Sequence, residues 1–115
     1  MSNLRNSVRL VGFLGSDPEV KMVANKKVAR ASIAVNEYHK NEKGEKTEET
    51  QWYSLVMWDK TAILAENYLH KGSEISIEGR LKSGSYSDKA GVKKYFTEIV
   101  VNDIMFMGAK KERKA

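Results

Sequence analysis

Residues 50–60 read Thr50-Gln51-Trp52-Tyr53-Ser54-Leu55-Val56-Met57-Trp58-Asp59-Lys60. This stretch holds both tryptophans of the protein, lacks glycine and proline, and is rich in aromatic and aliphatic residues, which is typical of a β-strand. Side chains alternate between the two faces of a strand. One face then carries Tyr53, Leu55 and Met57, and the other carries Trp52, Ser54, Val56 and Trp58. The first set suits a core, whereas the second presents two indoles separated by roughly 20 Å along the strand.

Two interpretations of the tryptophan face are open from this stretch alone. The indoles could pack inside a barrel or at a subunit interface. They could instead be separate platforms for the bases of a single-stranded nucleic acid, which requires exposed aromatic residues on a basic surface. The rest of the chain has to distinguish these alternatives.

Size and composition indicate one domain without membrane segments. The chain has 115 residues, of which 41% are hydrophobic, and no apolar run approaches the roughly 20 residues that cross a bilayer. The N-terminus has no apolar segment of the signal-peptide type, and the absence of cysteine excludes a disulfide framework. These features fit a cytosolic protein.

The charge is unevenly distributed. The net charge is +5, and the run Lys110-Lys111-Glu112-Arg113-Lys114 supplies +3 of it, which leaves +2 for the rest. An acidic partner therefore requires one particular basic face on the folded body, because a general excess of positive charge is missing there.

The remaining pattern predicts further strands and one helix. Strands are expected at 8–14, continuing at 20–23, and at 28–38, 74–86 and 93–107, with the helix at 59–71. Asp59 is expected to cap the helix with its carboxylate, and Gly72 to end it in a left-handed conformation. The almost wholly charged segment 40–49 is typical of a long, mobile hairpin loop that joins the strand at 28–38 to the tryptophan strand.

The order of three strands, a helix and two strands indicates an all-β protein with the OB-fold. This is a five-stranded antiparallel barrel with one helix between strands three and four. We expect an OB-fold domain at 1–108 and a basic, disordered tail at 109–115.

The pattern does not favour an enzyme or a cofactor. His39 and His70 lack metal-ligand spacing, and Glu48 and Glu49 are neighbours that would point to opposite sides of a strand. The sequence contains neither a nucleophile-elbow motif nor a phosphate-cradling glycine loop.

The polar faces of the predicted strands share one character. Each combines aromatic residues with cations or polar residues: Tyr38 with Arg30, Trp52 and Trp58 with Ser54, and Tyr86 with Arg80 and Lys82. Burying all four aromatic residues would also bury these cations, which is costly without partners. Taken together, the faces favour a nucleic-acid surface over an internal packing role for the tryptophans.

Three stretches resemble the bacterial-type single-stranded DNA-binding proteins. They are Val11-Gly12-Phe13-Leu14-Gly15-Ser16-Asp17-Pro18-Glu19-Val20, the stretch 50–60, and Tyr68-Leu69-His70-Lys71-Gly72-Ser73 through Ile77-Glu78-Gly79-Arg80-Leu81. The similarity runs from about Asn6 to Met107.

The resemblance implies a sequence-independent DNA-binding function in replication, recombination or repair. It assigns base stacking to Tyr38, Trp52, Trp58 and Tyr86. Weaker contacts from basic residues are expected from Arg30, Lys60, Arg80, Lys82 and Lys21. It also implies a homotetramer, with a dimer as the alternative, a location in the bacterial cytosol or nucleoid, and no membrane partner.

One departure from the family concerns the end of the sequence. Typical members end in a long linker and an acidic tip that recruits repair enzymes, whereas this sequence ends in the basic run. The sequence fits a short form, from a plasmid, phage or mobile element, or a truncated chain, and tip-mediated recruitment is not expected. Two alternatives remain: an OB-fold replication-restart protein that acts through protein contacts, and an RNA-binding OB module.

Overall fold

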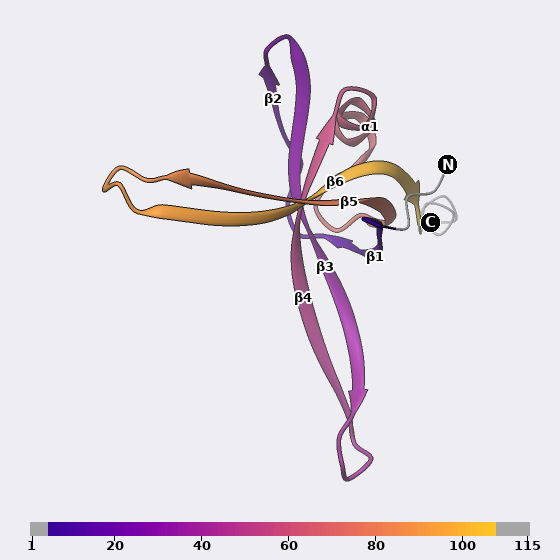
Figure 1. Cartoon of the computed structure of the whole chain (residues 1–115). Helices are drawn as coiled ribbons and strands as arrows, with labels where there is room; N and C mark the ends of the chain where they lie inside the picture. Colours follow the sequence, from indigo (N-terminus) through magenta and orange to yellow (C-terminus); the bar gives the residue numbers. More distant parts are fainter. Residues whose placement is uncertain (1–4, 108–115) are drawn as a thin grey trace.

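The computed structural model describes residues 5–107, which form six strands and one helix (Figure 1). The elements are β1 Val8–Leu14, β2 Glu19–Val23, β3 Lys26–Lys40, β4 Lys46–Trp58, α1 Lys60–Tyr68, β5 Glu74–Ser87 and β6 Lys93–Phe106. The predicted tail at 109–115 lies outside the described residues.

The strands close into the expected barrel. The sheet order is β1-β5-β6-β4-β3-β2, and β1 closes the ring by also pairing with β3 through Phe13 and Leu14. Gly12 lies where β1 passes from β5 to β3, and a Cβ there would lie 2.2 Å from the carbonyl oxygen of Ala34. Only glycine permits this approach of the two backbones.

Two details of the barrel differ from the prediction. The segment at 19–23 is a strand of its own that pairs with β3, so the helix follows the fourth strand of the chain rather than the third. The pairing of β4 with β6 is parallel, at Leu55 with Ile99 and Val56 with Val100, so the barrel is not wholly antiparallel. A parallel pair joins strands that are distant in sequence, and neither strand's own pattern reveals it.

The core is built from one face of each strand together with α1. Its buried residues are Leu14, Ala29, Ile33, Leu55, Met57, Ala62, Ala65, Leu69, Ile75, Ile77, Ile99 and Val101. The alternation in the sequence therefore assigns the core face of the tryptophan strand correctly. Val56 is the exception, since it belongs to the opposite face and is nevertheless buried.

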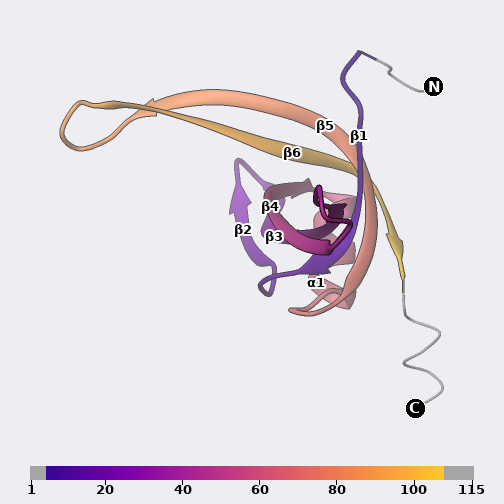
Figure 2. The same ribbon diagram turned by 90° about the horizontal axis from the view of Figure 1, so that it is seen from below.

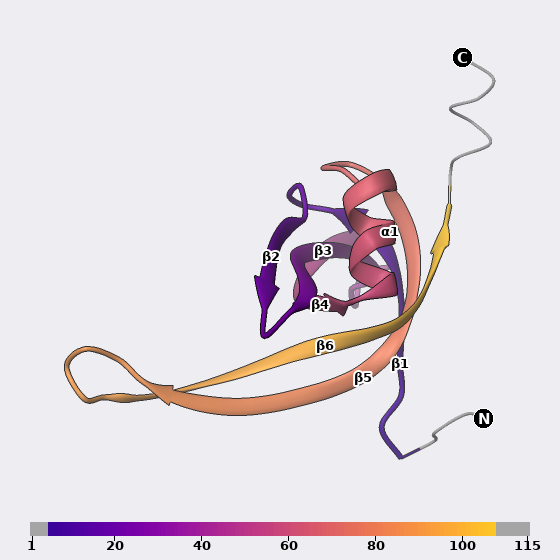
Figure 3. The same cartoon turned by 90° about the horizontal axis from the view of Figure 1, so that it is seen from above.

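The helix covers one side of the barrel and is shorter than expected (Figure 3). Asp59 has a φ of 51° and makes no side-chain capping bond; its backbone N–H donates to the Lys27 carbonyl instead. Leu69 is already extended, and Gly72, with a φ of 93°, turns the chain after the helix has ended. Asp59 does occupy the N-cap position, but the predicted side-chain capping bond and the helical assignment of 69–71 were wrong, because contacts with β3 and the turn fix these residues.

Two hairpins extend beyond the barrel as arms (Figures 1 and 2). The β3–β4 ladder continues to the pair Lys40 and Lys46, and the β5–β6 ladder to Ser87 and Lys93. Half of the segment 40–49 is therefore strand, and its turn is held by the Asn41 side chain, which accepts the N–H groups of Lys43 and Glu45. The expectation of a long loop failed because highly charged residues can line both faces of an exposed hairpin.

Within residues 5–107, no helix is long and apolar enough to cross a membrane; α1 has nine residues.

Candidate nucleic-acid interface

The side of the sheet opposite the core carries the candidate site, and we call it the outer face. One row of cross-strand partners crosses it from β2 to β5: Glu19, Arg30, Val56, Val100 and Arg80. Directly opposed residues in a sheet point to the same side. Every other row on this face can therefore be assigned from the pairing register.

The register places all four predicted stacking residues on the outer face. Trp52 is opposite Ala34, Trp58 opposite Val28, Tyr38 opposite Glu48 and Tyr86 opposite Lys94. Tyr38, Trp52 and Tyr86 are exposed, at 68%, 61% and 57%, whereas Trp58 is half-buried. Three ring systems are thus available to a ligand, and Trp58 offers part of its surface.

Trp52 lies over a gap left by glycine. A Cβ on Gly15 would lie 2.3 Å from Cζ3 of the indole, so Gly15 makes room for one edge of the ring. Gly15 is itself fixed by donation of its N–H to the carbonyl of Ser32 on β3. The indole is held in place while most of its surface remains open.

Phe96 is an aromatic member of the face that the sequence reasoning missed. It is opposite Gly84 in the β5–β6 ladder, and a Cβ on Gly84 would meet its ring at 2.5 Å. Its centroid is 6.4 Å from that of Tyr86. Phe96 has the parity of Glu98 and opposes that of the buried Ile99, so the signal was present in the sequence.

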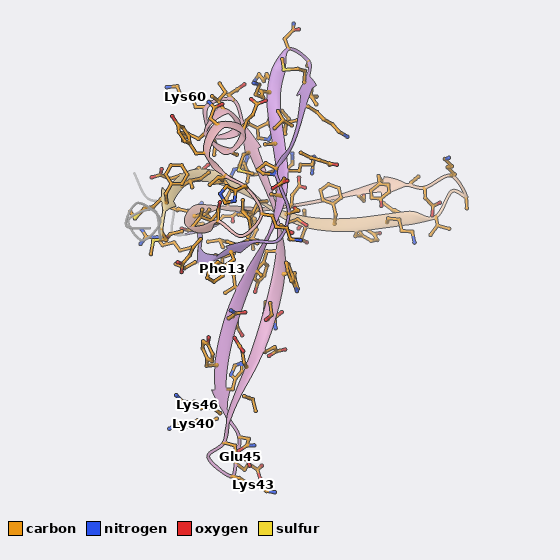
Figure 4. All side chains as sticks on the ribbon, turned by 180° about the vertical axis from the view of Figure 1, so that it is seen from behind. Phe13, Lys40, Lys43, Glu45, Lys46 and Lys60 are labelled. Carbon is orange, nitrogen blue, oxygen red and sulfur yellow. The ribbon has the colours of Figure 1, made fainter. Side chains whose placement is uncertain are left out.

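The predicted cations do not all gather with the aromatic residues. Arg30, Arg80 and Lys82 lie on the outer face of β3 and β5, and Lys21 joins it opposite Val28. Lys60 lies at the start of α1, at the other end of the molecule from the tip of the β3–β4 arm (Figure 4). Lys60 is therefore distant from the aromatic residues on the two arms.

Other lysines collect where the sequence suggested only a solvated loop. Lys40, Lys43 and Lys46 surround the tip of the β3–β4 arm, together with Glu45 (Figure 4). The arm carries Tyr38 near this tip, opposite Glu48. Since segment 40–49 also holds four glutamates, a nucleic-acid strand following the arm would meet a ring and charges of both signs.

A hollow of about 440 Å³ lies on the outer face. Its lining is polar and mixed in charge: Ser16, Asp17, Glu19, Arg30, Ala31, Ser32, Ser54, Leu55 and Glu98. Arg30 donates from Nη1 to Oε2 of Glu98 at 2.8 Å. This pair joins β3 to β6 across β4, which lies between them in the sheet.

The back of the β3–β4 arm brings together three side chains that could ligate a metal. Nε2 of His39 lies 3.6 Å from Oε1 of Glu37 and 3.6 Å from Oε1 of Glu49. His39 was expected to lack metal-ligand neighbours, because the two glutamates come from different strands and sequence spacing does not show the grouping. All three are substantially exposed, and their contacts are those of ion pairs formed when the imidazole is protonated.

Comparison with known proteins identifies similar chains. The model described as "Single-strand binding protein family" matches residues 5–107. "Single-stranded DNA-binding protein 1" of Chlorobaculum tepidum is 43% identical over 107 residues, covering 91% of this chain and 66% of that protein. "Single-stranded DNA-binding protein" of Xanthomonas campestris pv. campestris is 38% identical over 108 residues, covering 93% and 63%. This chain thus spans slightly less than two thirds of the length of these relatives.

A solved structure with the same fold contains nucleic acid. The structure titled "Plasmodium falciparum SSB complex with ssDNA" superposes with a TM-score of 0.80 at 28% identity. The match covers 93% of this chain and 97% of that one.

Proposed function

The chain belongs to the single-strand binding protein family, and from this premise we propose that it binds single-stranded DNA without reading its sequence. Bases stack on the outer-face aromatic residues, and phosphates pair with lysine and arginine side chains. The observation that carries this proposal is the exposure of Tyr38, Trp52 and Tyr86 on one face of the sheet, opposite the core. The named relatives and the complex with ssDNA support it.

The roles of the individual residues follow from their positions. Trp52 and Tyr38 provide the stacking surfaces of the β3–β4 hairpin, and Tyr86 and Phe96 provide those of the β5–β6 hairpin. Trp58, which is half-buried, contributes a smaller stacking surface. Arg80, Lys82 and Lys21 supply charge on the same face, whereas Lys60 meets DNA only if the strand continues past α1.

The binding activity would protect single strands exposed in replication, recombination or repair. We expect the protein in the bacterial cytosol or nucleoid, where such strands occur. We assign the binding to the OB-fold at 1–108 and a supporting, charge-based role to 109–115, and no chemical reaction to either.

We also propose that the protein assembles as a homotetramer. One edge of β1 pairs with β5 along Val8–Phe13, but its other edge pairs with β3 only at Phe13 and Leu14. Along 8–12, this second edge has no partner strand in the described part of the chain. Val11 and Phe13, exposed at 48% and 43%, lie on one side of this strand. An open edge beside exposed apolar residues favours pairing with a second copy. A solution mass of four chains of 13.0 kDa is expected, and a mass of one chain at micromolar concentration would refute assembly.

The function is tested by fluorescence anisotropy with labelled oligonucleotides of equal length. We expect binding to oligo-dT that is not displaced by duplex DNA, because paired bases cannot reach the aromatic faces. Preferential displacement by oligo-U would indicate the RNA-binding alternative. Absence of binding to every single strand would favour a protein-interaction module.

A further inference from the structure

The Arg30–Glu98 pair is an unusual feature for the middle of a surface that binds a polyanion. The Glu98 side chain is only 11% exposed, whereas that of Arg30 is 56% exposed. Their 2.8 Å contact is a charge-assisted hydrogen bond. A carboxylate held at this position neutralises one of the cations that the outer face offers to phosphates.

The register shows why Glu98 is nearly covered. Arg30 is opposite Val56 on β4, and Glu98 precedes Ile99, which is the partner of Leu55 on β4. The arginine therefore reaches across β4, and Val56 beneath this crossing is buried although it belongs to the outer face.

The surroundings of the pair favour release of Arg30 toward a ligand. Lys82 is opposite Glu98 on β5, so the carboxylate keeps a neighbouring cation when Arg30 turns away from it. Glu98 thus has a second cation next to it in the ladder, while Arg30 is more than half exposed. A phosphate that approaches the hollow can replace the carboxylate as the acceptor of the Arg30 hydrogen bonds.

We propose that Glu98 is an intramolecular competitor of the DNA phosphates, which holds Arg30 in the free protein and thereby lowers the affinity for single strands and its dependence on salt. This inference rests on the proposed function. In the free protein the arginine is already paired, so its transfer to a phosphate exchanges one ion pair for another. Removal of the carboxylate charge leaves Arg30 available from the start.

The test is Glu98→Gln, which keeps the size and an oxygen acceptor but removes the charge. Oligo-dT binding is titrated by tryptophan quenching at several salt concentrations. We expect the Kd to fall by about 3- to 10-fold at low salt and the slope of log affinity against log salt to steepen by up to about 0.7, the value of one additional paired phosphate on a single strand. A thermal melt of the free variant verifies that it is folded.

Two further variants show whether Glu98 acts through Arg30. Glu66→Gln also removes one negative charge, but from the Lys27–Glu66 pair between β3 and α1, and its slope should remain that of the wild type. In an Arg30→Gln background, Glu98→Gln should give no further gain. An equal gain there would mean that Glu98 simply repels DNA, and a loss of affinity in Glu98→Gln would mean that it supports binding; either result overturns the proposal.

The proposed function fails separately from this inference. If the wild type does not bind oligo-dT at all, the function is wrong. If it binds and Glu98→Gln has the same affinity and slope, only the competitor role of Glu98 is refuted.

Discussion

Replacement of Trp52 by alanine should separate binding from folding. Trp52 is 61% exposed, so about two fifths of its surface is covered. A large aromatic side chain buries about 150–250 Å² when fully covered, so this fraction corresponds to about 60–100 Å². At about 25 cal/mol per Å², Trp52→Ala removes at most about 1.5–2.5 kcal/mol of folding free energy, an upper limit because unfolded chains also bury surface.

The same substitution should also raise the Kd for oligo-dT, because the indole is a stacking surface for a base. Stacking of one base is worth about 1–3 kcal/mol, which corresponds to an increase of about 5- to 150-fold in the Kd for oligo-dT. The assay is anisotropy of a labelled oligo-dT, with urea unfolding of the same variant as the check on stability. Trp52→Phe keeps a ring and should recover part of the affinity.

Tyr95 provides the matched control for this experiment. It is 76% exposed on the β5–β6 arm, opposite Ser85 in the ladder and on the side away from Phe96 and Tyr86. Tyr95→Ala removes an even more accessible ring and should leave the Kd unchanged. Wild-type affinity in folded Trp52→Ala, or equal losses in both variants, would refute the assignment of stacking to the outer face.

Three further changes test other parts of the proposed binding mode and fold. Gly84→Ala places a Cβ 2.5 Å from the Phe96 ring, so the ring must move and the Kd for oligo-dT should rise severalfold without loss of fold; an unchanged Kd would remove Phe96 from the site. Gly79→Ala places a Cβ 2.2 Å from the Val100 carbonyl oxygen at the bulge between Glu78 and Gly79, and should cost about 1–3 kcal/mol or more in urea unfolding; wild-type stability would contradict the close approach. Deletion of 109–115 should leave tryptophan quenching at saturation intact and make the salt slope shallower by about 0.7 for each phosphate that the tail neutralises, whereas an unchanged slope would give the tail no part in binding.

The sequence was sufficient for features that depend on one strand at a time. Alternation around Trp52 and Trp58 correctly placed Leu55 and Met57 in the core, because a period of two is imposed by the strand itself. The all-β class and the OB-fold followed from the order of the elements. Alternation also placed Tyr38, Trp52, Trp58 and Tyr86 on polar faces, and the family resemblance then assigned base stacking to these four positions.

Features that depend on two strands could not be predicted in the same way. The parallel pairing of β4 with β6, the Arg30–Glu98 bond across β4 and the burial of Val56 all require the register between distant segments. The helix ends were misplaced for a similar reason. The N–H of Lys71 donates to the side chain of Asp17 in the β1–β2 connection, and this tertiary contact overrides local helix propensity.

Photocrosslinking tests most directly whether DNA lies on the outer face. An oligo-dT carrying halogenated uracil would be irradiated in complex with the protein, and the crosslinked residues identified by mass spectrometry. We expect adducts on Trp52, Tyr38 and Tyr86, whose rings are exposed on that face. Adducts concentrated instead on Tyr95 or on Tyr68 of α1, which are exposed elsewhere, would contradict the outer-face assignment.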